Sequence, residues 1–161
     1  MTKSAQDATR TAVLASIGRF HRYDEDLAAG AQPSPEQLEA LKGEGFEVIF
    51  NISPASARNA LPAEAGIVEG LGMDYVHFPV DCSNLRPIHY REFRGILSGI
   101  EDKKVFVHCG GNIKSSNLLH MYLVLERGVP EEESLAILRQ IQDPEAKWFA
   151  YFKSMGMRGL S

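Results

Sequence analysis

Residues 104–118 read KVFVHCGGNIKSSNL, and this segment changes character twice. It begins as a short apolar run, Val105 to Val107, which is typical of a buried β-strand. A small polar loop follows, and leucines and a tyrosine then recur at helical spacing, which predicts a helix. Cys109 therefore lies where a strand ends and a glycine-containing loop leads into the N-terminus of a helix.

This arrangement predicts a binding site for an anion. Backbone N–H groups of such a loop can point inward, and the helix dipole favours negative charge at its N-terminus. The same positive potential favours the thiolate of Cys109, which is the nucleophilic form of cysteine. A buried structural cysteine is the alternative, because free cysteines are among the most buried side chains. The His-Cys pair, the two glycines and the following helix favour the nucleophile.

The segment resembles the signature loop of the cysteine-dependent protein phosphatases, the tyrosine and dual-specificity superfamily. Their pattern is His-Cys, five further residues, Arg, and then Ser or Thr, and His108, Cys109 and Ser116 match it. Two positions depart from the pattern. Asn112 stands where the family usually has Gly, and Ser115 stands where it has the phosphate-binding Arg. The second departure removes the cation that clamps the phosphoryl group.

A variant of the family pattern carries Asn at the third and Arg at the fifth position after the cysteine. By that resemblance, Asn112 and Lys114 form a coherent pair, and Lys114 would be the clamp, as a point charge without the bidentate fork of arginine. In the standard register, Ser115 occupies the clamp position and Lys114 points to solvent. The two registers stay open, and the paired departure favours Lys114.

The resemblance implies further roles in this loop. Ser116 would hydrogen-bond the sulfur and help it leave, and His108 would orient the loop from behind. Their structural alternatives are a helix-cap serine and a core histidine. The phosphate oxygens would be bound by the backbone of Gly110, Gly111, Asn112, Ile113, Lys114, Ser115 and Ser116.

The same resemblance indicates a general acid. In the family an aspartate lies on the loop after the strand that precedes the signature, and Asp81, at the end of Phe78-Pro79-Val80-Asp81, looks like that residue. It would protonate the leaving oxygen and then activate water against the phosphocysteine. A turn or cap aspartate is the alternative. Arg58 and Arg86 are candidate substrate contacts on neighbouring loops.

Strands and helices alternate along the rest of the chain. We expect a lead-in or helix over residues 1–20, an edge strand over 27–32, strands over 46–52 and 75–80, and helices starting near residues 34, 63, 87, 131 and 143. Ser34, Pro35 and Gln37 form a helix start with a capping box. The run from Ala31 to Ile52 looks like the first helix-strand unit of bacterial phosphatase-like domains akin to the beta-lactamase-hydrolase-like group.

This alternation predicts one α/β domain over residues 1–161. Its centre is a mostly parallel sheet of about four to five strands, with helices on both faces. Ligands of such sheets bind beyond the carboxyl ends of the strands. We therefore expect Arg58, Asp81, Arg86 and the Cys109 loop to be neighbours.

Composition excludes several other classes of protein. The chain has 161 residues, a net charge of −4 and no basic run, which argues against nucleic-acid binding. No stretch approaches the ~20 apolar residues of a membrane span. A signal-peptide pattern is absent, and the two cysteines, Cys82 and Cys109, are more simply free thiols.

We expect a cytoplasmic protein; a leader already removed would leave no trace. Metals and cofactors are not expected, because His77, His89 and His120 have no metal-ligand spacing.

These observations predict a hydrolase of phosphate monoesters that works through a phosphocysteine. Its substrate would be a phosphorylated small molecule or phosphoprotein, whose identity stays open, as does the oligomeric state. Two alternatives belong to other classes. One is a phosphate- or phosphoprotein-binding module that has lost catalysis, and the other is a sulfur-transfer or redox enzyme that uses Cys109.

Overall fold

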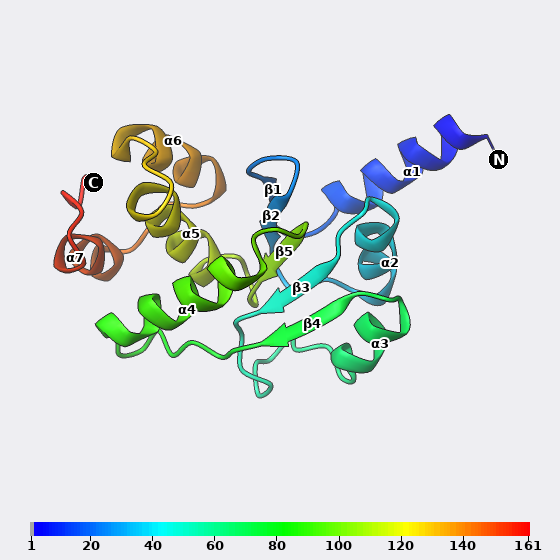
Figure 1. Cartoon of the computed structure of the whole chain (residues 1–161), viewed down its shortest axis with the longest axis horizontal. Helices are drawn as coiled ribbons and strands as arrows, with labels where there is room; N and C mark the ends of the chain where they lie inside the picture. The colour runs from blue at the N-terminus through cyan, green and yellow to red at the C-terminus, as the bar shows by residue number, and fades with distance from the viewer. Residues whose placement is uncertain (1) are drawn as a thin grey trace.

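A five-stranded sheet forms the centre of the structure, a computed structural model that describes residues 2–161 (Figure 1). The strand order is β1-β2-β5-β3-β4, and all neighbours are parallel except β1 and β2. This confirms the predicted, mostly parallel α/β sheet. The strands are β1 (His21–Arg22), β2 (Leu27–Gly30), β3 (Val48–Asn51), β4 (Asp74–His77) and β5 (Val105–His108).

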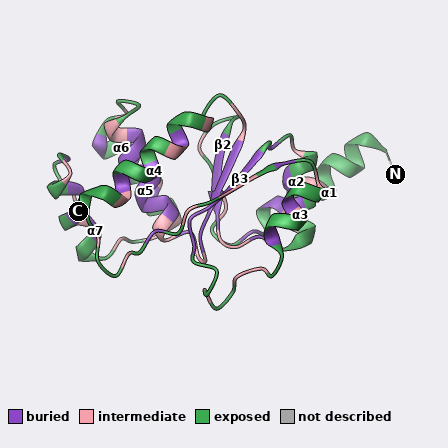
Figure 2. Cartoon of the chain, turned by 60° about the horizontal axis from the view of Figure 1, so that its bottom comes forward, coloured by how far each residue is buried: buried purple, intermediate pink, exposed green. Residues whose placement is uncertain are grey.

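Helices cover both faces of the sheet (Figures 1 and 2). They are α1 (Lys3–Ala15), α2 (Pro35–Gly43), α3 (Glu64–Gly70), α4 (Pro87–Ile100), α5 (Lys114–Leu125), α6 (Glu131–Ile141) and α7 (Ala146–Ser154). The first three pack on one face and the last four on the other. None of the helices within residues 2–161 is long and apolar enough to cross a membrane.

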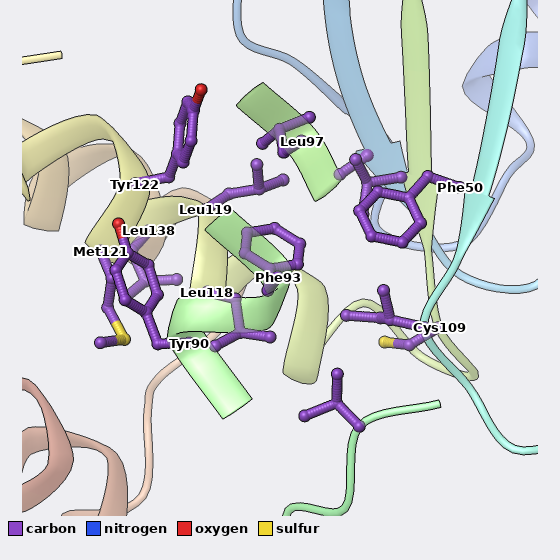
Figure 3. Close-up of a cluster of buried hydrophobic side chains, with 14 of the residues drawn as sticks. Phe50, Tyr90, Phe93, Leu97, Cys109, Leu118, Leu119, Met121, Tyr122 and Leu138 are labelled. Carbon is purple, nitrogen blue, oxygen red and sulfur yellow. The ribbon is translucent and has the colours of Figure 1, made fainter. Parts of the chain in front are cut away.

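Successive strand residues are buried against opposite layers, as the pleat of a strand requires. Ile49 and Phe106 belong to the cluster that contains residues of α1, α2 and α3, whereas Phe50 and Val107 belong to the cluster that contains residues of the other four helices. On this second face the rings of Phe50 and Phe93 stack with their centroids 5.6 Å apart. Figure 3 shows Cys109 at the margin of the same cluster, so that its backbone is anchored by a closely packed core.

The capping box predicted at the start of α2 is present. The Ser34 hydroxyl accepts a hydrogen bond from the Gln37 N–H at 3.2 Å, and the Gln37 side chain accepts one from the Ser34 N–H at 2.9 Å. Gly45 then has a φ of +99°, and Gly72 has +83° after α3, conformations that suit glycine after a helix.

Two sequence predictions about strands were wrong in detail. Residues 27–30 lie inside the sheet, and the edge is β1, whose two residues are too few to give a sequence pattern. The strand predicted over residues 75–80 ends at His77, because Pro79 has no N–H to donate to a ladder. Val80 still donates to the Ile52 carbonyl at 3.0 Å, so the chain continues beside β3 toward the same edge.

Candidate active site

The Cys109 loop leaves the centre of the sheet. It follows β5, which lies between β2 and β3, and the loops after β3 and β4 leave from the same edge. Arg58 is exposed on the first of these loops, Asp81 is exposed on the second, and Arg86 is exposed just before α4. The loops leave from one edge, as the parallel topology predicted. Asp81 and Lys114 line one hollow, which includes neither Arg58 nor Arg86, so that the role of these two arginines as substrate contacts stays a prediction.

Hydrogen bonds from distant segments turn the first carbonyls of the loop outward. The Gly110 carbonyl accepts from the Gln32 N–H at 3.1 Å and from the Asn59 side-chain amide at 2.9 Å. The Gly111 carbonyl accepts from the Arg19 guanidinium at 3.3 Å. Because a peptide unit is planar and trans, a carbonyl held outward directs the next N–H inward.

The second half of the loop is held in the same way. The Asn112 carbonyl accepts from the Ser116 hydroxyl, and the Ile113 carbonyl accepts from the side-chain amides of Asn117 at 2.9 Å and Gln142 at 3.3 Å. Within residues 2–161, the backbone N–H groups of residues 110–116 donate no hydrogen bond to a protein acceptor. These amides form a cradle at the N-terminus of α5, where an anion is favoured.

Asn112 sets the course of this loop. Its φ is +59°, a left-handed conformation that asparagine tolerates better than most other residues. Its side-chain amide donates to the Arg19 carbonyl at 2.8 Å, and its side-chain oxygen accepts from the Ser115 hydroxyl at 2.6 Å. The asparagine thus replaces the usual glycine and also ties the loop to the residues before β1.

Cys109 is buried, with 3% of its surface exposed, and its sulfur lies 3.3 Å from the Ser115 hydroxyl oxygen. The resemblance led us to expect Ser116 beside the sulfur. In the structure the Ser116 hydroxyl instead donates to the Asn112 carbonyl and accepts from the Gln142 side chain at 3.0 Å. The hydroxyl that contacts the sulfur therefore comes one residue earlier than in the standard pattern.

Lys114 is half-buried and does not point to solvent. Its ammonium group donates to the Val80 carbonyl, immediately before Asp81. A hollow of about 240 Å³ separates the two loops and is lined by Pro54, Pro79, Val80, Asp81, Cys82 and Lys114. The lysine thus brings a positive charge to the gap between the Cys109 loop and the Asp81 loop.

Asp81 adopts a turn conformation. Its Oδ1 accepts from the Ser83 hydroxyl at 2.6 Å and from the Ser83 N–H at 2.9 Å. These bonds, the hydroxyl first, lower the pKa of the Asp81 carboxyl, and the charges of His89 and Lys114 act in the same direction. The structure therefore has Asp81 as an exposed carboxylate at the rim of the site.

Comparison with known proteins rests on structure, because the sequence matches no family model and no curated protein. A DUF442 protein from Shewanella putrefaciens CN-32, a candidate phosphatase, superposes with a TM-score of 0.77. The two share 26% identity over 89% of this chain and 95% of the other. The fold is thus that of the cysteine-dependent tyrosine and dual-specificity phosphatases. Its resemblance extends to the DUF442 branch.

Two further structures share the fold of this phosphatase-like chain. Tk-PTP in its active form superposes with a TM-score of 0.71 at 20% identity, over 87% of this chain and 97% of the other. A Cys-to-Ser variant of TpbA from P. aeruginosa, in complex with phosphotyrosine, gives a TM-score of 0.71 at 14% identity. That match covers 88% of this chain and 85% of TpbA. The phosphatase-like fold predicted from the residues around Cys109 is thereby confirmed.

Several residues that hold this phosphatase-like loop could not be found from the sequence. Arg19, Asn59 and Gln142 are isolated polar residues with no motif around them, and each reaches the loop from a distant part of the chain. Gln32 is different, because it belongs to the Gln-Pro-Ser segment on which part of the resemblance rests. Glu64 was missed as well, although it is an acidic residue buried behind the loop.

Proposed function

We propose that the chain hydrolyses phosphate monoesters through a phosphocysteine formed on Cys109. One observation carries the proposal: the amides of residues 110–116 are free to bind an anion, because the loop carbonyls are engaged from outside. Such a cradle stabilises the phosphoryl oxygens in the bound substrate and, more strongly, as charge moves onto them in the transition state. The sulfur at the start of this cradle would face the phosphorus.

Two chemical steps follow. In the first, the Cys109 thiolate forms an S–P bond, the bond from phosphorus to the leaving oxygen breaks, and protonated Asp81 gives its proton to that oxygen. In the second, water attacks the phosphocysteine, the Asp81 carboxylate accepts a water proton, and the S–P bond breaks. The Ser115 hydroxyl, which donates to the Asn112 side-chain oxygen in the resting structure, would rotate and donate its hydrogen to the departing thiolate. This is the role that the resemblance gave to Ser116.

We further propose that Lys114 replaces the signature arginine. If the loop is one residue shorter than the standard pattern, Lys114 and Ser115 take the positions of the family's Arg and its following hydroxyl residue. The contact between Ser115 and the Cys109 sulfur supports this register. So does the direction of Lys114, whose ammonium group lies at the Val80 carbonyl, next to Asp81.

The substrate class is proposed from the same geometry. A cradle of backbone amides recognises the phosphoryl group and places few demands on the rest of the molecule. TpbA, which shares the fold, binds phosphotyrosine as a Cys-to-Ser variant. An aryl phosphate is therefore the first substrate to test, on a small molecule or on a phosphoprotein.

The test is turnover of an aryl phosphate combined with trapping of the intermediate. We expect the wild-type chain to release phosphate and, after acid quenching, to carry one phosphoryl group on Cys109 in a mass-spectrometric map. Cys109→Ser should lose turnover and the adduct while it still binds inorganic phosphate. Cys82→Ser is the matched control and should still form the adduct. Full turnover in Cys109→Ser would exclude the proposal, and binding without turnover in the wild type would support the binding module.

A further inference from the structure

A buried carboxylate lies directly behind the Cys109 loop. Glu64, the first residue of α3, has 5% of its surface exposed. Its oxygens accept hydrogen bonds from the Tyr75 hydroxyl at 2.6 Å, the Asn51 side-chain amide at 3.0 Å and the Gln32 side-chain amide. His108 completes the cluster, with Nε2 at 3.1 Å from Glu64 Oε1. Glutamate is seldom buried to this extent without a partner of opposite charge.

The donors around Glu64 indicate that it is ionised. Burial raises the pKa of Glu64, but the hydrogen bond and charge of His108, together with the hydrogen bonds of Tyr75 and Gln32, leave it below its usual value. Burial and the carboxylate both raise the pKa of Tyr75, so its hydroxyl keeps its proton and remains a donor. His108 is the neighbour of this carboxylate, within the described residues, that can carry a positive charge.

The imidazole of His108 lies between two acceptors. Nε2 faces the Glu64 carboxylate, and Nδ1 lies 3.2 Å from the Cys109 carbonyl oxygen. A neutral imidazole has one N–H and can donate to one of these acceptors, whereas the protonated ring donates to both. The geometry therefore favours an imidazolium that is fully buried next to the nucleophile.

The bond to the Cys109 carbonyl matters for anion binding. This carbonyl shares a peptide plane with the Gly110 N–H, so that keeping the oxygen outward keeps this N–H directed into the cradle. The carbonyls of Gly110 and Gly111 are held by other partners, as described above. His108 thus controls the direction of the Gly110 N–H, the first amide of the cradle.

We propose that Glu64 is a positioning residue, which acts through His108 on the Cys109 loop. It keeps the imidazole doubly protonated, and the imidazolium then holds the Cys109 carbonyl outward and favours the neighbouring thiolate. This inference rests on the proposed function only in assuming that the Cys109 loop binds an anion. Tyr75, Asn51 and Gln32 orient the carboxylate, but they do not contact Cys109.

The backbone before Glu64 supports a specific role for this side chain. Ala63 has a φ of +58°, a conformation that costs a residue with a Cβ atom on the order of 1 kcal/mol or more. Ala63 makes no side-chain cap hydrogen bond at the start of α3. The strained residue thus stands immediately before the glutamate that is turned inward to His108.

Other charged groups near Cys109 belong to different parts of the chain. Lys114 lies on its own loop, while Asp81 and Cys82 lie on the loop after β4. The Cys82 thiol has its pKa raised by burial to about 11, and it therefore stays neutral at physiological pH. Glu64 reaches the Cys109 carbonyl through His108, and its second link to the loop runs through Gln32, whose N–H holds the Gly110 carbonyl. Neither link involves Lys114, Asp81 or Cys82, so a test can separate the effect of Glu64 from theirs.

The first experiment measures the alkylation of Cys109 by iodoacetamide as a function of pH, in a Cys82→Ser chain where it is the remaining cysteine. Glu64→Gln should move the midpoint of this profile upward by about one pH unit or more, because the nearby imidazolium loses its counter-charge and deprotonates. Tyr75→Phe should lower the melting temperature but leave the midpoint in place. Glu69→Gln, an exposed site on the same helix, should change neither.

The second experiment measures tungstate affinity by calorimetry in the Cys109→Ser background, where no turnover occurs. Glu64→Gln should weaken tungstate binding about tenfold or more, while Glu69→Gln should not change it. If Glu64→Gln does not fold, His108→Gln tests the same contact and should shift the alkylation midpoint upward. An unchanged midpoint in the folded variant, or an equal shift in Tyr75→Phe, would overturn the inference.

These readouts do not depend on phosphatase turnover. If the wild type binds tungstate but releases no phosphate from esters, the proposed hydrolase fails and the role of Glu64 is still decided by the two measurements. If Cys109→Ser abolishes turnover while Glu64→Gln leaves alkylation and tungstate binding unchanged, the hydrolase stands and the positioning role fails.

Discussion

The sulfur of Cys109 lies 3.3 Å from the hydroxyl oxygen of Ser115, and the hydroxyl of the next residue, Ser116, donates to the Asn112 carbonyl. Two adjacent serines at the start of α5 therefore have separate partners. Ser115 contacts the sulfur, and Ser116 closes the first turn of the helix.

Replacing Ser115 with alanine should slow the second chemical step. The substitution removes a hydrogen bond to a charged sulfur, and the rate of this step should therefore decrease on the order of tenfold or more. Stopped-flow measurements with an aryl phosphate should then show a burst of product, because the phosphocysteine accumulates. In Ser116→Ala we expect a lower melting temperature without an enlarged burst. Equal bursts in the two variants would contradict the assignment.

Lys114 should be the cation that clamps the phosphoryl group. Lys114→Ala should reduce turnover by on the order of a hundredfold, as expected for the loss of one preorganised contact to transition-state charge. Lys114→Arg should keep or raise turnover. Ser115→Arg should gain nothing, because Ser115 is fully buried and has no room for a guanidinium. Turnover near that of the wild type in Lys114→Ala would rule out the shifted register.

Asp81 should control the alkaline limb of the pH–rate profile. A general acid acts in its protonated form, so activity should fall as the pH rises through the pKa of Asp81. Because the hydrogen bonds from Ser83 lower this pKa, they move the alkaline limb to lower pH. Ser83→Ala removes the largest of these effects and should move the limb upward. Asp81→Asn should abolish the limb and should slow alkyl phosphates more than aryl ones. Profiles on one substrate of each kind provide the measurement, and an equal, pH-independent loss on both would contradict it.

Mild acid should destabilise the fold through His120. Burial lowers the pKa of His120 to about 4 from its ordinary value of 6.5. The unfolded chain therefore binds a proton that the folded chain excludes, and stability is lost as the pH falls from about 6.5 to 4, by about 3 kcal/mol in total. Urea titrations at pH 7 and pH 5 should show part of this loss, and His120→Asn should reduce the difference. The pKa values of Glu64 and Glu131 are lowered in the folded chain, so their contributions to the free energy of unfolding are lost at more acidic pH.

The elements that could be predicted from sequence are those with a strong local signal. The capping box of Ser34 and Gln37 defines the start of α2 by hydrogen bonds between neighbours in the chain. The strand before Cys109 begins with the apolar run Val105 to Val107, and every residue of the strand is buried. Parallel topology then brings the loop after each strand to one edge of the sheet. The location of the candidate site follows from these elements.

The details of the site depend on contacts that leave no local signal. The register of Ser115 and Ser116 at the sulfur is set by the left-handed backbone of Asn112, which a sequence pattern does not specify. Asp81 bonds to Ser83, two residues away, as an ordinary turn aspartate does, so the sequence could not separate a turn from a general acid. Arg19 reaches the loop from a segment before β1 whose position depends on the whole sheet.

The bonds that turn the loop carbonyls outward also have a consequence for the order of folding. Arg19 and Asn59 reach the loop across sequence separations of 92 and 51 residues. Contacts between such distant residues form slowly, since the loops they close must lose entropy before the contacts stabilise the chain. During refolding, the ability to bind an oxyanion should therefore appear later than helical circular dichroism. Oxyanion affinity would serve as a reporter of the completely assembled chain.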